Sequence, residues 1–306
     1  MAKFSTLQAV LKKAQKGGYA VGAFNVNNME FVQAIIAAGN ATKSPVIIST
    51  TEGAIKYAGL DYLYSIISVA LSKAKVPVVL HLDHGRDMKV IKACLKAGYK
   101  SVMYDGSHLP FKENVKQTRR VVKMAKKYGA SVEGELGTIG GAEDLVSSRK
   151  IVLTEPEDAK KFVKQTGVDA LAVAIGTSHG AYKFTSSSKL DIKRLDAIEA
   201  AVRVPLVLHG ASGVPSLLVK LANKFGAKIK NAHGVSDKDI RAVVKRGICK
   251  VNEDTDLRLA FTGALRQALH KKPAVFDPRK LLGPGRDAVQ KIVENRIKVL
   301  GSRGKA

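Results

Sequence analysis

Residues 76–85 read VPVVLHLDHG, an apolar, β-branched run that ends in two imidazoles and a carboxylate. Continuous apolar runs of this length are typical of strands buried on both faces, as in parallel sheets. His81, Asp83 and His84 close the run. The strand predicted here therefore leads from a core to a polar face.

The same pattern recurs along the chain, with amphipathic, helix-like stretches between the apolar segments. The other seven segments are YAVGAFN (19–25), SPVIIST (44–50), KSVMYDGS (100–107), ASVEGELG (130–137), DALAVAIG (169–176), VPLVLHG (204–210) and ICKVNEDT (248–255). Glycines such as Gly98, Gly129 and Gly247 stand where the intervening helices should end. Eight strand–helix units predict an α/β fold, a (β/α)8 TIM barrel forming one domain over residues 1–306. The alternative, an open doubly wound sheet, is weakened because no G-x-G-x-x-G motif follows the first strand.

The segments outside the eight units have their own signals. TDLRLAFTGALRQALHKK and GRDAVQKIVENRIKVLGS predict a C-terminal helical extension over about 256–306, with FDPRKLLGPG as the connection between them. Two loops are long, 138–158 and 211–237, and the second includes an apolar stretch compatible with a helix. Long loops in a compact fold often act as lids or binding segments.

The composition limits the classes of function. The formal charge is +25, from 51 Lys and Arg against 26 Asp and Glu, but the lysines are spread over predicted helix faces. No dedicated nucleic-acid or membrane partner is therefore predicted. No apolar run approaches the roughly 20 residues of a membrane span, and the first helix lacks a signal peptide's apolar core. Cys94 and Cys249 lie in separate apolar patterns, which favours free buried thiols and a cytoplasmic location.

Every predicted strand ends, on its carboxyl side, in side chains able to bind a metal, move a proton or hold a phosphate. In chain order they are Asn25; Ser49, Thr50 and Thr51; Asp83 and His84; Asp105 and Ser107; Glu133 and Glu135; His179; His209; and Asn252, Asp254 and Thr255. The carboxyl ends of parallel strands share one face of a barrel, where the active sites of this fold lie. The set predicts an active site at that face.

Three of these residues, His84, His179 and His209, come from three different strand ends. Three imidazoles, joined by Glu135 or by a water, suit Zn²⁺, and an open position makes such a site catalytic. Any one histidine taken alone is better explained as a hydrogen-bonded residue of the rim. Three together favour a metal.

Other polar residues near these positions admit two interpretations. His81 lies earlier on its strand and is interpreted as structural or as support for a ligand. Asp105 and Glu133 are candidates to support the ligands or to hold a second metal. Strand alternation turns Asp83 away from His84, where it either transfers protons or pairs with a charge.

Glu143 follows two glycines in the first long loop, where it is either a solvated carboxylate or a general acid/base that swings over the metal. The segments GTSHG (176–180) and HGASG (209–213) either turn backbone N–H groups toward a phosphate or form ordinary turns. Arg258 and Arg279 are either anion clamps or surface charges.

The motifs GAFNVNN, TEGAIKY, HLDHG, SVMYDGSH, VEGELG, AIGTSHGAY, PLVLHGASG and KVNEDTDLRLAF occur in this order and span essentially the whole chain. This collinear set closely resembles the zinc-dependent (class II) fructose-1,6-bisphosphate aldolases. The resemblance implies a (β/α)8 barrel that reversibly cleaves fructose 1,6-bisphosphate to dihydroxyacetone phosphate and glyceraldehyde 3-phosphate through a metal-stabilised enediolate. It also implies a phosphorylated sugar substrate, a place in glycolysis or gluconeogenesis, and a homodimer or homotetramer.

The resemblance implies roles for individual residues. The positions that match the zinc ligands are His84, His179 and His209, with Glu135 as the alternative ligand. Asp83 matches the residue that exchanges a proton with the C4 hydroxyl, Glu143 the loop carboxylate that acts on C3, and Asn252 the residue that contacts the enediolate. The positions that match substrate and phosphate binding, with a monovalent cation (Na⁺ or K⁺) nearby, are Asn25, Thr51, Gly180, Gly210, Ser212, Asp254, Thr255 and Arg258, together with Arg279 from a neighbouring subunit.

The sequence departs from the family pattern at two positions. Thr51 stands where serine is expected in T-S-E-G, and Glu253 where threonine is usual in N-T-D-T-D. Glu253 adds a negative charge near a phosphate site, which weakens affinity unless its side chain points outward. Related enzymes acting on tagatose 1,6-bisphosphate, the alternative substrate, usually lack the D-T-D run that is present here. A lysine Schiff base, the other way to stabilise a carbanion at C3, has no candidate lysine at a strand end.

Overall fold

The computed structural model describes residues 4–143, 146–148, 151–180, 190–230 and 232–306, and for 142, 143, 146–148 and 179 only the backbone. Eight parallel strands close into a barrel in the order β1, β2, β3, β4, β5, β8, β10 and β11, with β11 paired to β1. The strands are β1 (Val21–Asn25), β2 (Val46–Thr51), β3 (Val78–Gly85), β4 (Ser101–Tyr104), β5 (Ser131–Leu136), β8 (Ala170–Val173), β10 (Leu206–Leu208) and β11 (Ile248–Glu253). Seven of them fall within predicted segments and β2 runs one residue past its segment, so the (β/α)8 barrel is confirmed.

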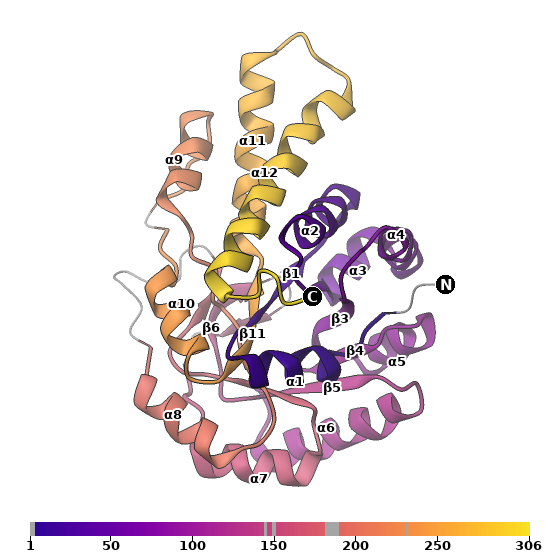
Figure 1. The fold of residues 1–306 in the computed structure, drawn as a ribbon, viewed down its shortest axis with the longest axis vertical. Helices are drawn as coiled ribbons and strands as arrows, with labels where there is room; N and C mark the ends of the chain where they lie inside the picture. The colour runs from indigo at the N-terminus through magenta and orange to yellow at the C-terminus, as the bar shows by residue number, and fades with distance from the viewer. Residues whose placement is uncertain (1–3, 144–145, 149–150, 181–189, 231) are drawn as a thin grey trace.

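Helices surround this barrel (Figure 1). They are α1 (Leu7–Gly17), α2 (Met29–Thr42), α3 (Glu52–Ala58), α4 (Leu60–Ser72), α5 (Met88–Ala97), α6 (Phe111–Lys126), α7 (Pro156–Thr166), α8 (Ile192–Ala201), α9 (Ser216–Lys224), α10 (Asp237–Val244), α11 (Thr255–Lys271) and α12 (Pro278–Leu300). In the part of the chain described, no helix combines the length and apolar character needed to cross a bilayer.

The interior of the barrel changes character from one end to the other. At the amino ends of the strands, side chains such as Val79 and Ala170 form an apolar layer, and Leu7 and Leu11 of α1 pack against it. Along β3 the outward Leu80 and Leu82 join the helix-facing core, because successive side chains of a strand point to opposite faces. The inward positions turn polar toward the carboxyl ends, which places the chemistry at one mouth of the barrel.

The first long loop contains strands that the sequence did not predict. β6 (Gly140–Glu143) pairs antiparallel with β7 (Val146–Ser148), and β6 also pairs in parallel with β9 (Ser178–His179). Such short, Gly- and Ser-containing segments carry no alternation of apolar and polar residues, so their pairing left no signal. This small sheet joins the segment after β5 to the segment after β8. The second long loop contains α9, as its apolar stretch indicated.

The last helix, α12, begins earlier than the sequence predicted. α12 begins at Pro278, because Asp277 caps it by accepting a hydrogen bond from the Arg279 N–H and proline suits a first helical turn. Much of the stretch predicted as connection is therefore helical. α12 packs against α11 and α2, and the connection between α11 and α12 lies at the projecting end of the pair (Figure 1).

Candidate active site at the barrel mouth

The carboxyl ends of β3 and β10 bring two histidines and a carboxylate together. Ligand atoms of Asp83, His84 and His209 all lie within 4.8 Å of one another, and so do those of His84, Asp105 and Glu135. All five side chains are buried. These are residues that the sequence placed at the active site, and the fold joins them from four different strand ends.

His84 is held by carboxylates. Its Nδ1 lies 3.2 Å from Asp105 Oδ2, which also accepts two hydrogen bonds from the Arg86 guanidinium, at 3.0 and 2.8 Å. Burial disfavours the charged imidazolium, but Asp83, Asp105 and Glu135 outweigh burial and raise the pKa of His84 to about 10. The cluster around His84 therefore favours positive charge.

His209 is held by a second carboxylate, inside the barrel. Its Nε2 lies 2.7 Å from Glu133 Oε1, and the other oxygen of Glu133 accepts a hydrogen bond from Lys250 Nζ at 2.9 Å. All three side chains are fully buried. Lys250 was missed in the sequence, where a single lysine within ICKVNEDT is the only signal. Its ammonium balances Glu133, which in turn fixes the orientation of the His209 ring.

The inner nitrogens of these two rings face each other. His84 Nε2 and His209 Nδ1 are 2.9 Å apart, and each outer nitrogen is occupied by a carboxylate. Carboxylates that hold the far nitrogen of a ring are the usual support of histidines that bind zinc. Glu135 lies nearby, and burial and then Asp105 raise its pKa well above the usual range for a glutamate. The donors at the mouth therefore fit Zn²⁺, since two imidazoles and one carboxylate, Asp83, form one cluster, and Glu135 and Asp105 share His84 in a second.

One expectation from strand alternation is wrong. Asp83 does not turn away from His84, since both belong to the same cluster of possible ligand atoms. The pairing of β3 with β4 shifts register between Leu82 and Gly85, and His84 adopts a left-handed backbone with φ of 48°. A bulge breaks the alternation of a strand, and here it points both side chains into the mouth.

Asp83 accepts hydrogen bonds from two amides. Asn25 Nδ2 lies 3.3 Å from Oδ2, and Asn252 Nδ2 lies 2.9 Å from Oδ1. The carbonyl oxygens of these two amides, Asn25 Oδ1 and Asn252 Oδ1, are buried with no hydrogen-bond partner among the described residues, as are Ser49 Oγ and Thr177 Oγ1. Buried polar groups are normally paired, so these atoms indicate a place where a polar ligand binds. His81 lies deeper, with Nδ1 2.7 Å from Ser101 Oγ.

The structure places the backbone of two further predicted residues. Glu143 ends β6 and His179 ends β9, and the register pairs Gly141 with His179. The side chains of Glu143 and His179 lie outside the part of the chain that is described.

Four of the predicted phosphate-binding residues, Gly210, Ser212, Asp254 and Thr255, follow the ends of β10 and β11. Gly210 has a φ of 61°, and a Cβ there would lie 2.7 Å from the Ser178 carbonyl oxygen, so the turns at 176–180 and 209–213 touch only because residue 210 is glycine. Gly180 is also left-handed, with φ of 82°. Ser212 Oγ accepts a hydrogen bond from the Asp254 N–H, and Thr255 begins α11.

Three predicted binding residues have other contacts. Thr51 caps α3, because its hydroxyl accepts a hydrogen bond from the Ala54 N–H. Arg258 Nε lies 2.8 Å from Asp254 Oδ1. Arg279 is 89% exposed and pairs with Asp277 in the first turn of α12, so this chain does not bring it to its own barrel mouth.

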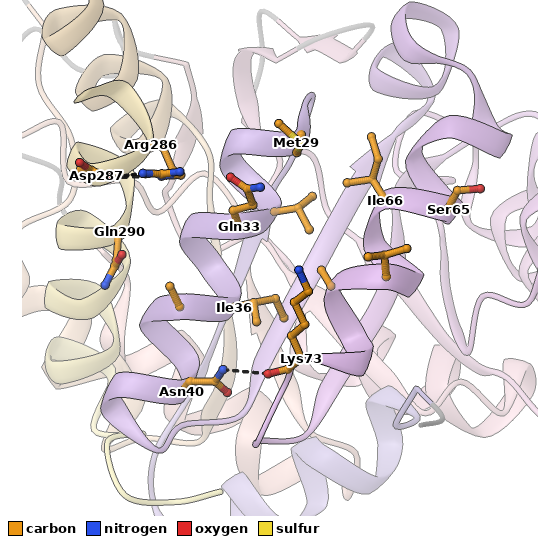
Figure 2. Close-up of a pocket in the computed structure, with 14 residues that line it drawn as sticks. Met29, Gln33, Ile36, Asn40, Ser65, Ile66, Lys73, Arg286, Asp287 and Gln290 are labelled. Carbon is orange, nitrogen blue, oxygen red and sulfur yellow. Dashed lines mark hydrogen bonds and ion pairs between the residues drawn. The ribbon is translucent and has the colours of Figure 1, made fainter. Parts of the chain in front are cut away.

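A separate groove of about 750 Å³ lies on the outside of the barrel between α2, α4 and α12 (Figure 2). Two contacts join polar groups of its lining: Arg286 pairs with Asp287, and Asn40 donates to the Lys73 carbonyl oxygen. The residues that line it include no histidine, cysteine or glutamate. The chemistry thus belongs to the mouth of the barrel.

Comparisons with known proteins agree with this geometry. The family described as "Fructose-bisphosphate aldolase class-II" matches residues 5–305. The chain is 49% identical to the fructose-bisphosphate aldolase of Giardia intestinalis, over 98% of this chain and 94% of that one. It is 48% identical to the fructose-bisphosphate aldolase of Thermus caldophilus, over 97% and 98%. The crystal structure of the YdjI aldolase from Escherichia coli K12 superposes with a TM-score of 0.79 at 31% identity, over 99% of both chains. The chain therefore belongs to the class II fructose-bisphosphate aldolases, a family of carbon–carbon lyases.

Proposed function

We propose that the mouth of this barrel binds zinc and reversibly cleaves fructose 1,6-bisphosphate into dihydroxyacetone phosphate and glyceraldehyde 3-phosphate. The observation that carries the proposal is the convergence of His84 Nε2 and His209 Nδ1, 2.9 Å apart, while carboxylates hold their outer nitrogens. The family and its named members support the substrate.

The ligands we assign to zinc are His84, His179 and His209, with Glu135 as the alternative ligand. When bound there, zinc supplies a Lewis acid where negative charge develops on the ketose as its C3–C4 bond breaks. Glu133 and Asp105 hold two of the rings by their outer nitrogens. A second metal at Asp105 and Glu133 is the less favoured assignment, because Arg86 and Lys250 already balance these carboxylates.

Asp83 accepts the proton of the C4 hydroxyl in this proposal. That proton must leave as C4 becomes an aldehyde carbon, and it returns when the reaction runs toward condensation. Asn25 and Asn252 donate to the two oxygens of Asp83, which orients the carboxylate without supplying a competing acid. Asn252 also lies 3.2 Å from His209 Nδ1, so the same amide sits where charge develops on the substrate.

Glu143 delivers the proton that C3 takes up after cleavage and removes it in the reverse direction. Its place at the end of β6 supports this role, because β6 pairs with β9, the strand that carries His179. The backbone of Glu143 therefore belongs to the same small sheet as the backbone of His179.

Phosphate binding is assigned to both ends of the substrate. The residues for the ketose phosphate are Gly180, Gly210, Ser212, Asp254 and Thr255, with Arg258 and a neighbouring subunit's Arg279 for the other phosphate. Asn25 and Thr51 are assigned to substrate or phosphate binding. The left-handed backbones of Gly180 and Gly210 support this assignment, because turns with such residues can present N–H groups to an anion. A monovalent cation, Na⁺ or K⁺, beside this phosphate rests on the family resemblance.

The assembly and the location are also proposals. A homodimer or homotetramer is supported by Arg279, which lies in the first turn of α12 with its side chain exposed, where a second subunit can receive it. A cytoplasmic location is supported by Cys94 and Cys249, which are both buried as free thiols.

The proposal is tested by following exchange of the C3 hydrogen of dihydroxyacetone phosphate with solvent. The Glu143→Ala protein should lose this exchange while it keeps the zinc content of the unaltered protein. Exchange at an unaltered rate would remove Glu143 from the reaction, and loss of zinc would make it a ligand instead. A Glu157→Ala protein, altered at the surface of α7, serves as the control.

A further inference from the structure

Glu253, where the sequence departs from the family pattern, is part of a buried ion pair outside the barrel interior. The inward positions of β11 are Lys250 and Asn252, which contact Glu133 and Asp83. Glu253 faces the other way and is fully buried, with Oε1 2.7 Å from Nε of Arg296. The carboxylate of Glu253 thus points away from the phosphate positions and forms an ion pair with the guanidinium of Arg296 in α12.

The same guanidinium contacts a second element. Arg296 Nη1 lies 2.6 Å from Oδ1 of Asp237, the first residue of α10, and Arg296 itself is only 2% exposed. Burial opposes its charge, but Glu253, Asp256 and Asp237 outweigh burial and raise the pKa of Arg296. One side chain therefore ties α12 to the end of β11 and to the start of α10, beside Asp256 in the first turn of α11.

Asp256 connects this cluster to the turn after β10. Its carboxylate accepts hydrogen bonds from the N–H of Gly213 at 2.9 Å and of Val214 at 2.7 Å. Val214 has a left-handed backbone with φ of 47°, which is strained for a β-branched residue and persists only where the surroundings impose it. Asp256 supplies that constraint.

The constrained turn is the one assigned to phosphate binding. Ser212 accepts a hydrogen bond from the Asp254 N–H through its hydroxyl and one from the Val235 N–H through its carbonyl. Gly210 precedes it in the same turn. Hydrogen bonds thus join the turn after β10 to the end of β11 and the start of α11, and Glu253, Asp256 and Arg296 lie on the outward side of these segments.

We propose that Arg296, paired with Glu253, is a positioning residue that holds the 210–214 turn and the Asp254–Thr255 segment in the conformation that binds the substrate phosphate. The inference rests on the proposed function, since it concerns the phosphate of that substrate. It also explains why position 253 can hold a carboxylate, because this carboxylate pairs with Arg296 and does not face the substrate phosphate.

A positioning role predicts a specific kinetic pattern. Phosphate contacts hold the substrate in the ground state and in the transition state alike, so weakening them raises KM more than it lowers kcat. Arg296 contacts Glu253 and Asp237 on the outward side of β11, whereas Asp83, His84 and His209 cluster at the mouth of the barrel. Zinc content should therefore be unaffected.

The test compares Arg296→Met, Arg296→Lys, Glu253→Thr and the double variant Glu253→Thr/Arg296→Met, with Lys298→Met, an exposed cation on the same helix, as control. Arg296→Met should raise KM for fructose 1,6-bisphosphate about tenfold with kcat within about threefold of the unaltered enzyme. Arg296→Lys should recover part of this loss. The double variant should bind substrate better than Arg296→Met, because it removes the fully buried Glu253 carboxylate together with the arginine that pairs with it.

Two results would overturn the inference. One is an Arg296→Met protein that melts cooperatively, holds zinc and keeps KM within about twofold of the unaltered enzyme. If Arg296→Met does not fold, the KM values of Glu253→Thr and of the double variant are measured instead. An unchanged KM in both would also overturn the inference. An unaltered chain that cleaves no fructose 1,6-bisphosphate would instead contradict the proposed function, so the two failures are distinguishable.

Discussion

His209 Nε2 lies 2.7 Å from Glu133 Oε1, and both side chains are fully buried. This contact leaves Nδ1 as the ring nitrogen that faces His84. The carboxylate sits between an imidazole and the ammonium of Lys250, so its loss affects both.

Glu133→Gln should weaken zinc binding by about 10- to 100-fold, the usual effect of removing a carboxylate that supports a ligand. An amide also leaves the Lys250 ammonium without its opposite charge, so the melting temperature should fall. Competition with a chromogenic chelator measures the first effect. Glu113→Gln, at the surface of α6, is the matched control, and equal zinc affinity in both variants would show that Glu133 does not support the site.

Asp83→Asn should lower kcat by at least about 100-fold, because the amide cannot accept the C4 proton. The replacement has the same shape, so the fold and zinc content should stay unchanged. Cleavage rates and zinc content, measured on the same preparation, distinguish a proton acceptor from a zinc ligand. A zinc-free variant would make Asp83 a ligand, and a kcat near that of the unaltered enzyme would exclude it as the proton acceptor.

Arg279→Ala and Asp83→Asn proteins, each nearly inactive, should regain activity when they are unfolded together and refolded as mixed oligomers. In a mixed dimer one site combines an intact Asp83 with an intact Arg279 from the other subunit, so random mixing restores about a quarter of the activity. No recovery in mixed oligomers, confirmed by differential tags, would mean that Arg279 does not act across an interface.

Both cysteines should resist thiol reagents in the folded protein. Burial raises the pKa of Cys94 and of Cys249 to about 12, and the thiolate is the reactive form. Labelling of the folded protein at pH 8 should be at least about 100-fold slower than in denaturant. Its rate should keep rising with pH above 9, where labelling of the unfolded chain levels off. Rapid labelling of either thiol at pH 8 would contradict the buried positions.

The sequence predicted the barrel because its strands are continuous apolar runs, and the mouth because parallel strands end at one face. It could not predict where side chains point when the pattern breaks. Asp83 and His84 share a side only because the register shifts and His84 is left-handed. That depends on contacts between β3 and β4 rather than on VPVVLHLDHG itself.

Contacts between residues far apart in the sequence could not be predicted either. Lys250 and Glu133 are 117 residues apart, and Arg296 and Glu253 are 43 apart. Nothing in a local pattern distinguishes a buried lysine in a strand, or a buried arginine in an amphipathic helix, from a solvated one. The carboxylate at position 253 is explained only by its ion pair with Arg296, which the sequence does not reveal.

The central claim, that the converging histidines hold the zinc on which aldol cleavage depends, is tested most directly by one assay. Cleavage of fructose 1,6-bisphosphate is measured before exhaustive chelation, after it, and after zinc is added back. We predict that activity disappears with the metal and returns with about one zinc per chain. Full activity in protein shown by metal analysis to be zinc-free would contradict the account.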